Sequence, residues 1–186
     1  MTAFVDEMQP DWTVAQGAAW FWDQTVNKGN RALCKCCKRH TQVYKRQLNT
    51  PMVCGLVYMI DQYNDNQTWV DMRTESPKEI IQHNTWGLLR YWGMVVKKPR
   101  TENEKNRGFW LPTNIGFQFA LGEIRVPSCM YVMDDTVILA SDETVNAEEA
   151  FYTGGDKYEE LMDGYKDRLE RLKSQGFWGV EDNELD

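Results

Sequence analysis

Four side chains that can bind a metal lie close together at Cys34, Cys36, Cys37 and His40. The C-x-x-C spacing of Cys34 and Cys37 lets two thiolates reach one Zn²⁺ at ~2.3 Å. His40 would be a third ligand, and Cys36 competes for the position of the second. A structural zinc takes four ligands, so the sequence predicts an incomplete zinc knuckle. The alternative is that these are ordinary small turn and core residues.

The knuckle would need a fourth ligand from elsewhere, because the sequence holds no second C-x-x-C or H-x-x-x-H pair. The isolated candidates are Cys54, His83 and Cys129, or a second copy of the chain. In the alternative interpretation, Cys54 and Cys129 are simply buried thiols.

The knuckle lies inside a basic stretch, 28–46, which contains seven Lys or Arg residues and no Asp or Glu. Such a stretch attracts phosphate and makes binding salt-dependent. A plain solvated surface is the alternative. The candidate nucleic-acid-binding residues here are Arg31, Lys35, Lys38, Arg39, Lys45 and Arg46.

Periodicity and capping signals outline the elements that would position these residues. In chain order they are a helix over 11–27, a strand over 42–46, a helix from 52 to 63 capped by Asn49, a strand over 69–72, helices over 77–83 and 85–92, the second capped by Asn84, and strands over 94–98 and 109–111. The part from 52 onward is the order of a winged helix-turn-helix, with 85–92 as recognition helix and 99–107 as wing. Its candidate DNA contacts are Arg90, Lys97, Lys98, Arg100 and Arg107. The apolar positions of 85–92 are equally well explained as core.

The C-terminal third is different in character. A helix is predicted over 114–121, then a hairpin with Asp134 and Asp135 at its turn, a short helix over 142–151, and an acidic helix over 156–175. Residues 134–186 carry a net charge of −11 and residues 1–133 a net +4, giving −7 for the whole chain. This asymmetry fits either a DNA-binding protein with an acidic extension or a protein that binds basic partners.

The fold class predicted is therefore α+β, a winged helix-turn-helix core with an N-terminal helix, a cysteine knuckle and a C-terminal hairpin plus helix. The expected division is 1–30 for the N-terminal helix, 31–127 for the knuckle and core, and 128–186 for the hairpin and acidic helical extension.

Several classes of protein are disfavoured. The chain has two His residues and no G-x-S-x-G, P-loop or H-E-x-x-H motif, so we expect no enzymatic activity. No apolar run approaches the ~20 residues that a membrane-spanning helix needs. The first residues carry acids and lack a basic signal-peptide region. A soluble, cytosolic protein with no membrane partner is expected.

Short motifs occur along most of the chain. They are C-x-x-C at 34–37, VYKR-x-L-N at 43–49, L-R-x-W-G at 89–93, R-G-F-W-x-x-T at 107–113, a G-E-I-x-V-P segment within 116–127, a strand at 131–133, and a K-Y-x-E-L-M-like segment at 156–162. In these motifs the chain resembles a family of small, largely uncharacterised proteins encoded by bacteriophages. The resemblance covers roughly 34–162 and implies a viral origin, hence the cytoplasm of a host, and a winged-helix-like core. Lys35 and Lys38 stand where the family usually has Pro and Gly, and Cys36 and His40 are additions.

Two functions follow from the sequence. The first is a DNA-binding accessory or regulatory protein, non-enzymatic, that grips the duplex with the basic stretch and the wing. The second is a protein-binding module that targets a host or defence protein through aromatic and acidic surfaces. Either could form a homo-oligomer.

Overall fold

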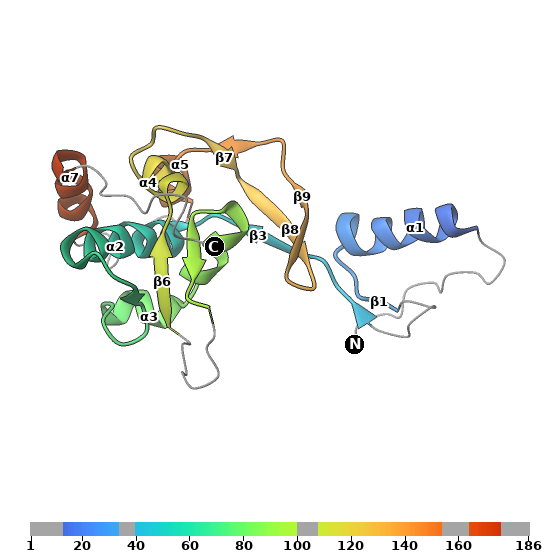
Figure 1. Cartoon of the computed structure of the whole chain (residues 1–186). Coiled ribbons are helices and arrows are strands. Elements are labelled where there is room, and N and C mark those ends of the chain that lie inside the picture. The colour runs from blue at the N-terminus through green and yellow to red at the C-terminus, as the bar shows by residue number, and fades with distance from the viewer. Residues whose placement is uncertain (1–12, 34–39, 100–107, 154–163, 176–186) are drawn as a thin grey trace. The chain divides into compact units, whose positions relative to one another are not determined.

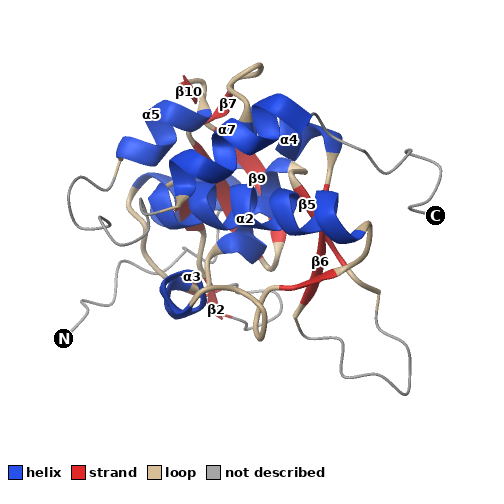
Figure 2. Cartoon of the chain, turned by 90° about the vertical axis from the view of Figure 1, so that its left-hand side faces the viewer, coloured by secondary structure: helices blue, strands red, loops and turns tan. Residues whose placement is uncertain are grey.

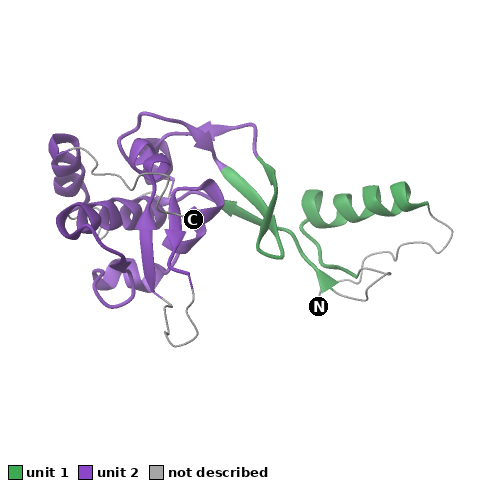
Figure 3. Cartoon of the chain, viewed as in Figure 1, with its two compact units in different colours: residues 1–46, 129–140 green, residues 47–128, 141–186 purple. Residues whose placement is uncertain are grey.

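The computed structural model describes residues 13–33, 40–99, 108–153 and 164–175. Its helices and strands mix along the chain, so the predicted α+β class is confirmed (Figure 1). The chain divides into two compact units (Figure 3). Unit 1 comprises 1–46 and 129–140, and unit 2 comprises 47–128 and 141–186. The expected three-part division at 30/31 and 127/128 stays a prediction.

Unit 1 begins with the helix α1 (Val14–Trp22), continued by a π-helical turn, η1 (Asp23–Asn27). Thr13 caps α1 through a capping box with Gln16, in which each side chain binds the other's backbone N–H. The predicted helix over 11–27 is confirmed within the described residues. The strands β1 (Ala32–Leu33) and β2 (His40–Thr41) then pair antiparallel.

The second sheet of unit 1 has the strand order β3-β8-β9. Its strands are β3 (Tyr44–Gln47), β8 (Cys129–Met133) and β9 (Thr136–Ala140). Asp134 and Asp135 join β8 to β9, and both have positive φ, as a two-residue type I′ turn requires. The predicted hairpin and its turn are confirmed.

Unit 2 is built around one long helix, α2 (Thr50–Asn66). Asn49 accepts a hydrogen bond from the Met52 backbone N–H, and Pro51 lies in the first turn, as predicted. Most of α2 is buried, because other elements of the unit pack around it. Three of these elements are the helices α4 (Asn114–Ala120), α5 (Ala147–Tyr152) and α7 (Tyr165–Gln175). Figure 2 shows the three helices beside α2.

A three-stranded sheet of order β4-β6-β5 completes this core. Its strands are β4 (Val70–Asp71), β5 (Val95–Lys97) and β6 (Phe109–Pro112), and β6 is antiparallel to both neighbours. The predicted hairpin of strands flanking the charged loop is confirmed, whereas the loop at 100–107 lies outside the described residues. A further two-stranded ladder joins β7 (Val126–Pro127) to β10 (Thr144–Val145).

Between β4 and β5 the chain forms two short helices, α3 (Lys78–His83) and η2 (Trp86–Trp92). The predicted helix over 85–92 is present as η2, a 3₁₀ helix, whereas the prediction that Asn84 caps it was wrong, since Asn84 ends α3 in the left-handed conformation. The 3₁₀ form follows from the spacing of Trp86, Leu89 and Trp92. Residues three apart eclipse one another in a 3₁₀ helix, so this conformation buries all three.

Candidate nucleic-acid interface

Arg90 is the cation of η2, and its guanidinium group is held in place at the protein surface. Its Nη1 donates to the Gly87 carbonyl at 2.9 Å, and its Nη2 donates to the Tyr91 hydroxyl at 3.0 Å. Its Cζ lies 4.6 Å from the centre of the Tyr91 ring, within the range of a cation–π contact. These contacts restrict the rotamers of a long side chain and present its positive charge in one orientation.

Two further cations lie at the end of β5, next to the predicted wing. Lys97 is exposed, with its Nζ 5.8 Å from the Trp110 ring centre. Lys98 is half-buried, with its Nζ 5.6 Å from the Phe109 ring centre. Since β6 carries both rings and pairs with β5, the hairpin itself orients the two ammonium groups.

A contact between η2 and β6 links Arg90 indirectly to Lys97. Gly87 packs against the Trp110 ring so closely that a Cβ at this position would lie 3.0 Å from the ring. Arg90 therefore binds the backbone of the residue that Trp110 contacts, and Lys97 approaches the same Trp110 ring. Gly87 and Trp110 thus connect Arg90 to Lys97 through a chain of contacts. Arg100 and Arg107 lie outside the described residues.

Three of the candidate cations in the basic stretch are described and belong to unit 1. Arg31 donates from Nε to Gln42 Oε1 at 3.1 Å. Lys45 is exposed on β3, and the Arg46 guanidinium lies 4.9 Å from the centre of the Tyr44 ring. Arg46 Nε is buried and has no hydrogen-bond partner within the part of the chain that the structure describes. Lys35, Lys38 and Arg39 lie outside that part.

The predicted knuckle falls largely outside the described residues, which exclude Cys34, Cys36 and Cys37. His40 is exposed on β2, where its register partner is Leu33. Among the residues described, no group of three or more His, Cys, Asp or Glu side chains is placed to hold a metal ion. Zinc binding by the knuckle therefore stays a prediction.

The candidates for a fourth ligand have different surroundings. Cys54 lies buried in α2, and burial raises the pKa of its thiol to about 12. A thiol with so high a pKa is poorly suited to bind metal as a thiolate. Cys129 is also buried, on β8, in agreement with the interpretation of both as structural thiols. His83 is exposed at the end of α3.

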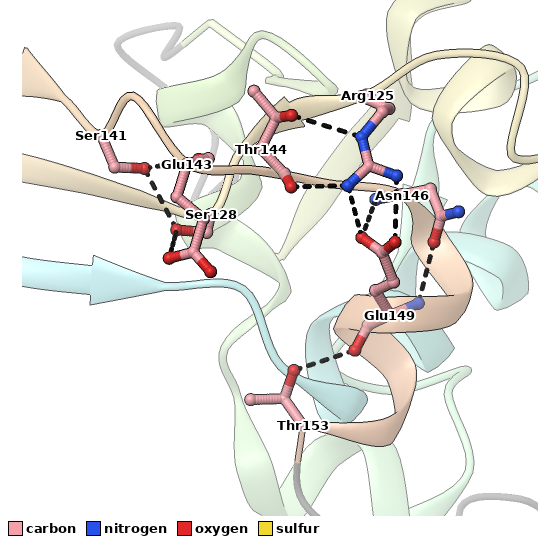
Figure 4. A network of polar contacts seen from close by, with 8 residues as sticks. All are labelled: Arg125, Ser128, Ser141, Glu143, Thr144, Asn146, Glu149 and Thr153. Carbon is pink, nitrogen blue, oxygen red and sulfur yellow. Dashed lines mark hydrogen bonds and ion pairs between the residues drawn. The ribbon is translucent and has the colours of Figure 1, made fainter.

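The sequence did not reveal a polar network that joins β7, β10 and α5 (Figure 4). Arg125 donates to both carboxylate oxygens of Glu149, at 3.0 and 2.7 Å, and to the Thr144 carbonyl at 2.7 Å. The hydrogen bonds from Arg125 are also the main reason that the pKa of the Glu149 carboxyl is lowered. One signal was readable, since Asn146 and Glu149 have the spacing of a capping box, which the structure contains. The network cancels the charge of Arg125, so this arginine adds little to an anion-binding surface.

The same network also joins Ser128 and Ser141, the two residues of unit 2 that flank segment 129–140 of unit 1. Ser128 Oγ lies 3.1 Å from Ser141 Oγ and 3.2 Å from Glu143 Oε2. The Ser128 backbone N–H donates to the Glu143 carbonyl, and its carbonyl accepts from the Leu48 N–H. These contacts hold the side chains of Ser128, Ser141 and Glu143 together.

A buried carboxylate on α2 is the other residue that sequence reasoning missed. The Asp61 side chain is 1% exposed, and its Oδ2 accepts from Arg171 Nη2 at 2.5 Å, with Arg168 Nε at 3.7 Å. Burial raises the pKa of the Asp61 carboxyl, and the neighbouring Asp65 adds to this, whereas Arg171 and Arg168 oppose it. Both arginines lie on α7, so this cluster attaches α7 to α2.

No protein-family model, no curated protein and no solved structure matches this chain. The resemblance to bacteriophage proteins therefore stays a prediction. Among the helices described, none is both long and apolar enough to cross a membrane.

Proposed function

We propose that the chain is a phage-encoded, non-enzymatic accessory or regulatory protein that binds double-stranded DNA in the host cytoplasm. In this proposal unit 2 is a winged-helix-like module. Its support is the order α2, β4, α3, η2, β5, β6 together with the sheet order β4-β6-β5. In this arrangement the short strand between the first two helices joins the strand that returns from the wing.

The observation that carries the proposal is the packed chain Arg90–Gly87–Trp110–Lys97. Through these contacts Arg90 of η2 and Lys97 of the β5–β6 hairpin are both connected to Trp110, on the strand that follows the predicted wing. Held cations lose less conformational freedom on binding phosphate than free ones. We expect Arg90, Lys97 and Lys98 to contact phosphates, with Arg100 and Arg107 extending the contact along the wing.

The test is fluorescence anisotropy with a labelled duplex of about 20 base pairs, titrated at ionic strengths from ~50 to ~300 mM. Three phosphate contacts give a slope of log K against log salt of about −2.7, and further contacts make the slope steeper. No binding at ~50 mM salt would overturn the proposal, because electrostatic binding is strongest there.

Matched variants separate a local interface from bulk charge. Arg90→Gln and Lys97→Gln each remove one positive charge from the interface and should weaken binding about tenfold at ~50 mM salt, with a slope shallower by about one. Lys166→Gln removes the same charge from an exposed position on α7 and should leave the slope unchanged. Equal effects of all three variants would show that the interface is not the one proposed.

The second candidate function, binding of a host or defence protein, is favoured by α1. This helix carries no charged residue, and Val14 and Trp22 are exposed by 91% and 42%. An isolated helix of this length is marginal in water, so an apolar partner would stabilise it. Capture of a host protein that survives high salt and is lost in Trp22→Ser would support this function over DNA binding.

A further inference from the structure

The strand β9 leaves one edge of the unit 1 sheet open. In the order β3-β8-β9, β9 pairs with β8 alone among the strands that the structure describes. Its sequence, Thr136 to Ala140, contains no charge and no proline, and its Val137 and Leu139 side chains are 38% and 40% exposed. The outer edge of such a strand offers N–H and C=O groups to another extended chain.

The two edges of this sheet differ in how they discourage pairing. β3 carries Lys45 and Arg46, and charges of this kind on an edge strand disfavour the addition of a further strand. β9 has only a bulge, since the register passes from Tyr131↔Leu139 to Val132↔Val137 and leaves Ile138 without a partner. A bulge adds twist, which prevents a long flat ladder but still allows a short strand to pair.

Charge at the turn indicates what kind of strand would fit. Asp134 and Asp135 are exposed immediately before β9, so an incoming segment with Lys or Arg at that end would meet opposite charges. A second copy is a poor fit. An antiparallel pair of β9 strands centred on Ile138 would align Asp134 with Asp142 of the other copy, and like charges opposite one another destabilise a ladder.

We propose that β9 is a docking edge for an extended segment of another protein, apolar and β-branched in its centre and basic at the end beside the β8–β9 turn. Such a segment binds by strand addition, in which main-chain hydrogen bonds provide affinity and the flanking charges provide orientation. This inference is independent of DNA binding, because none of the proposed DNA contacts lies on β9.

The probe is a synthetic peptide, Thr-Val-Ile-Val-Thr-Lys-Lys, whose basic C-terminal end would lie beside the β8–β9 turn in antiparallel addition. It is compared with the same peptide N-methylated at alternate central residues. Binding to the full chain is measured by anisotropy, and the site by amide exchange of 136–140. We expect the amides of β9 to become protected and N-methylation to weaken binding at least tenfold, since it removes the ladder donors. Equal binding of the two peptides would overturn the proposal without requiring any variant to fold.

Variants then locate the edge and its charge. Leu139→Lys should abolish binding, whereas Leu33→Lys, at a position with the same kind of exposure on β1, should not. Asn is favoured in type I′ turns, so D134N combined with D135N should keep the hairpin yet weaken binding about fivefold at low salt. Equal effects of the two lysine variants would refute the site. Concentration-dependent self-association that Leu139→Lys removes would show that a second copy occupies the edge.

Discussion

Replacing Arg171 by Met tests whether α7 is held on α2 by a buried charge. Met keeps the apolar stem of the side chain and removes the group that lies 2.5 Å from Asp61 Oδ2. Removing one partner of a fully buried ion pair costs about 3 to 5 kcal/mol. Arg171 is 44% exposed and Arg168 remains at 3.7 Å, so we expect a smaller loss in the free energy of unfolding, about 2 kcal/mol at neutral pH.

The pH dependence follows from the raised pKa of Asp61. An acid whose pKa is higher in the folded protein favours folding at low pH, and this contribution is lost as the pH rises above the ordinary Asp value of about 3.9. Removing Arg171 raises the pKa of Asp61 further, which makes that loss larger at neutral pH. Below about pH 3, Asp61 is largely protonated in both states, so the substitution should cost little there.

Urea unfolding of Arg171→Met and the unaltered chain at pH 7.5 and at about pH 3 measures this difference. Lys173→Met is the control, because Lys173 pairs with Glu170 on an exposed surface of the same helix. Such pairs contribute less than about 1 kcal/mol. The reasoning is refuted if Arg171→Met costs no more than the control at pH 7.5, or costs the same at both pH values.

The remaining predictions concern the knuckle, a close backbone approach and a thiol. Metal analysis of the purified chain should find one zinc per chain, reduced in Cys37→Ser, and less than about half an equivalent in the unaltered chain would contradict the knuckle. Gly116→Ala should lower the free energy of unfolding by about 1 to 3 kcal/mol, because its Cβ would lie 2.4 Å from the Met94 carbonyl oxygen. Gly55→Ala has more room and gains helix propensity, so it should lower the free energy of unfolding less. Thermal melts of the two variants measure this difference. Cys54, with a pKa of about 12, should resist alkylation in the folded protein at pH 8, and rapid labelling seen by mass spectrometry would contradict its burial.

Local chemistry explains which elements could be predicted from the sequence. Asn49 and Pro51 lie next to the start of α2 in the sequence and mark it. Asp134 and Asp135 mark the turn of the hairpin in the same way. Capping and turn preferences act over one turn of backbone, so they are visible without a fold. For the same reason the cap of η2 was wrongly assigned, since Asn84 belongs to the end of α3.

The parts that could not be predicted depend on residues distant in sequence. Asp61 and Arg171 are separated by 110 positions, and no local pattern connects them. The contact between Gly87 and Trp110 likewise exists only after β6 has returned beside η2. Sequence reasoning therefore found Arg90 and Lys97 as separate candidates and missed the contacts through Gly87 and Trp110 that connect them.

The composition of η2 limits how much base sequence the proposed interface can read. Trp86, Leu89 and Trp92 are buried, and the Tyr91 hydroxyl already accepts a bond from Arg90. Arg90 is then the one charged side chain that η2 offers to a base edge, and a single good contact discriminates by about 1 to 3 kcal/mol. Proteins that recognise a site use three or four such side chains. We therefore expect unrelated duplexes of equal length to bind within about tenfold of one another at fixed salt. A selection from random duplexes that yields a sequence bound more than about a thousandfold tighter would show that η2 reads bases by other contacts.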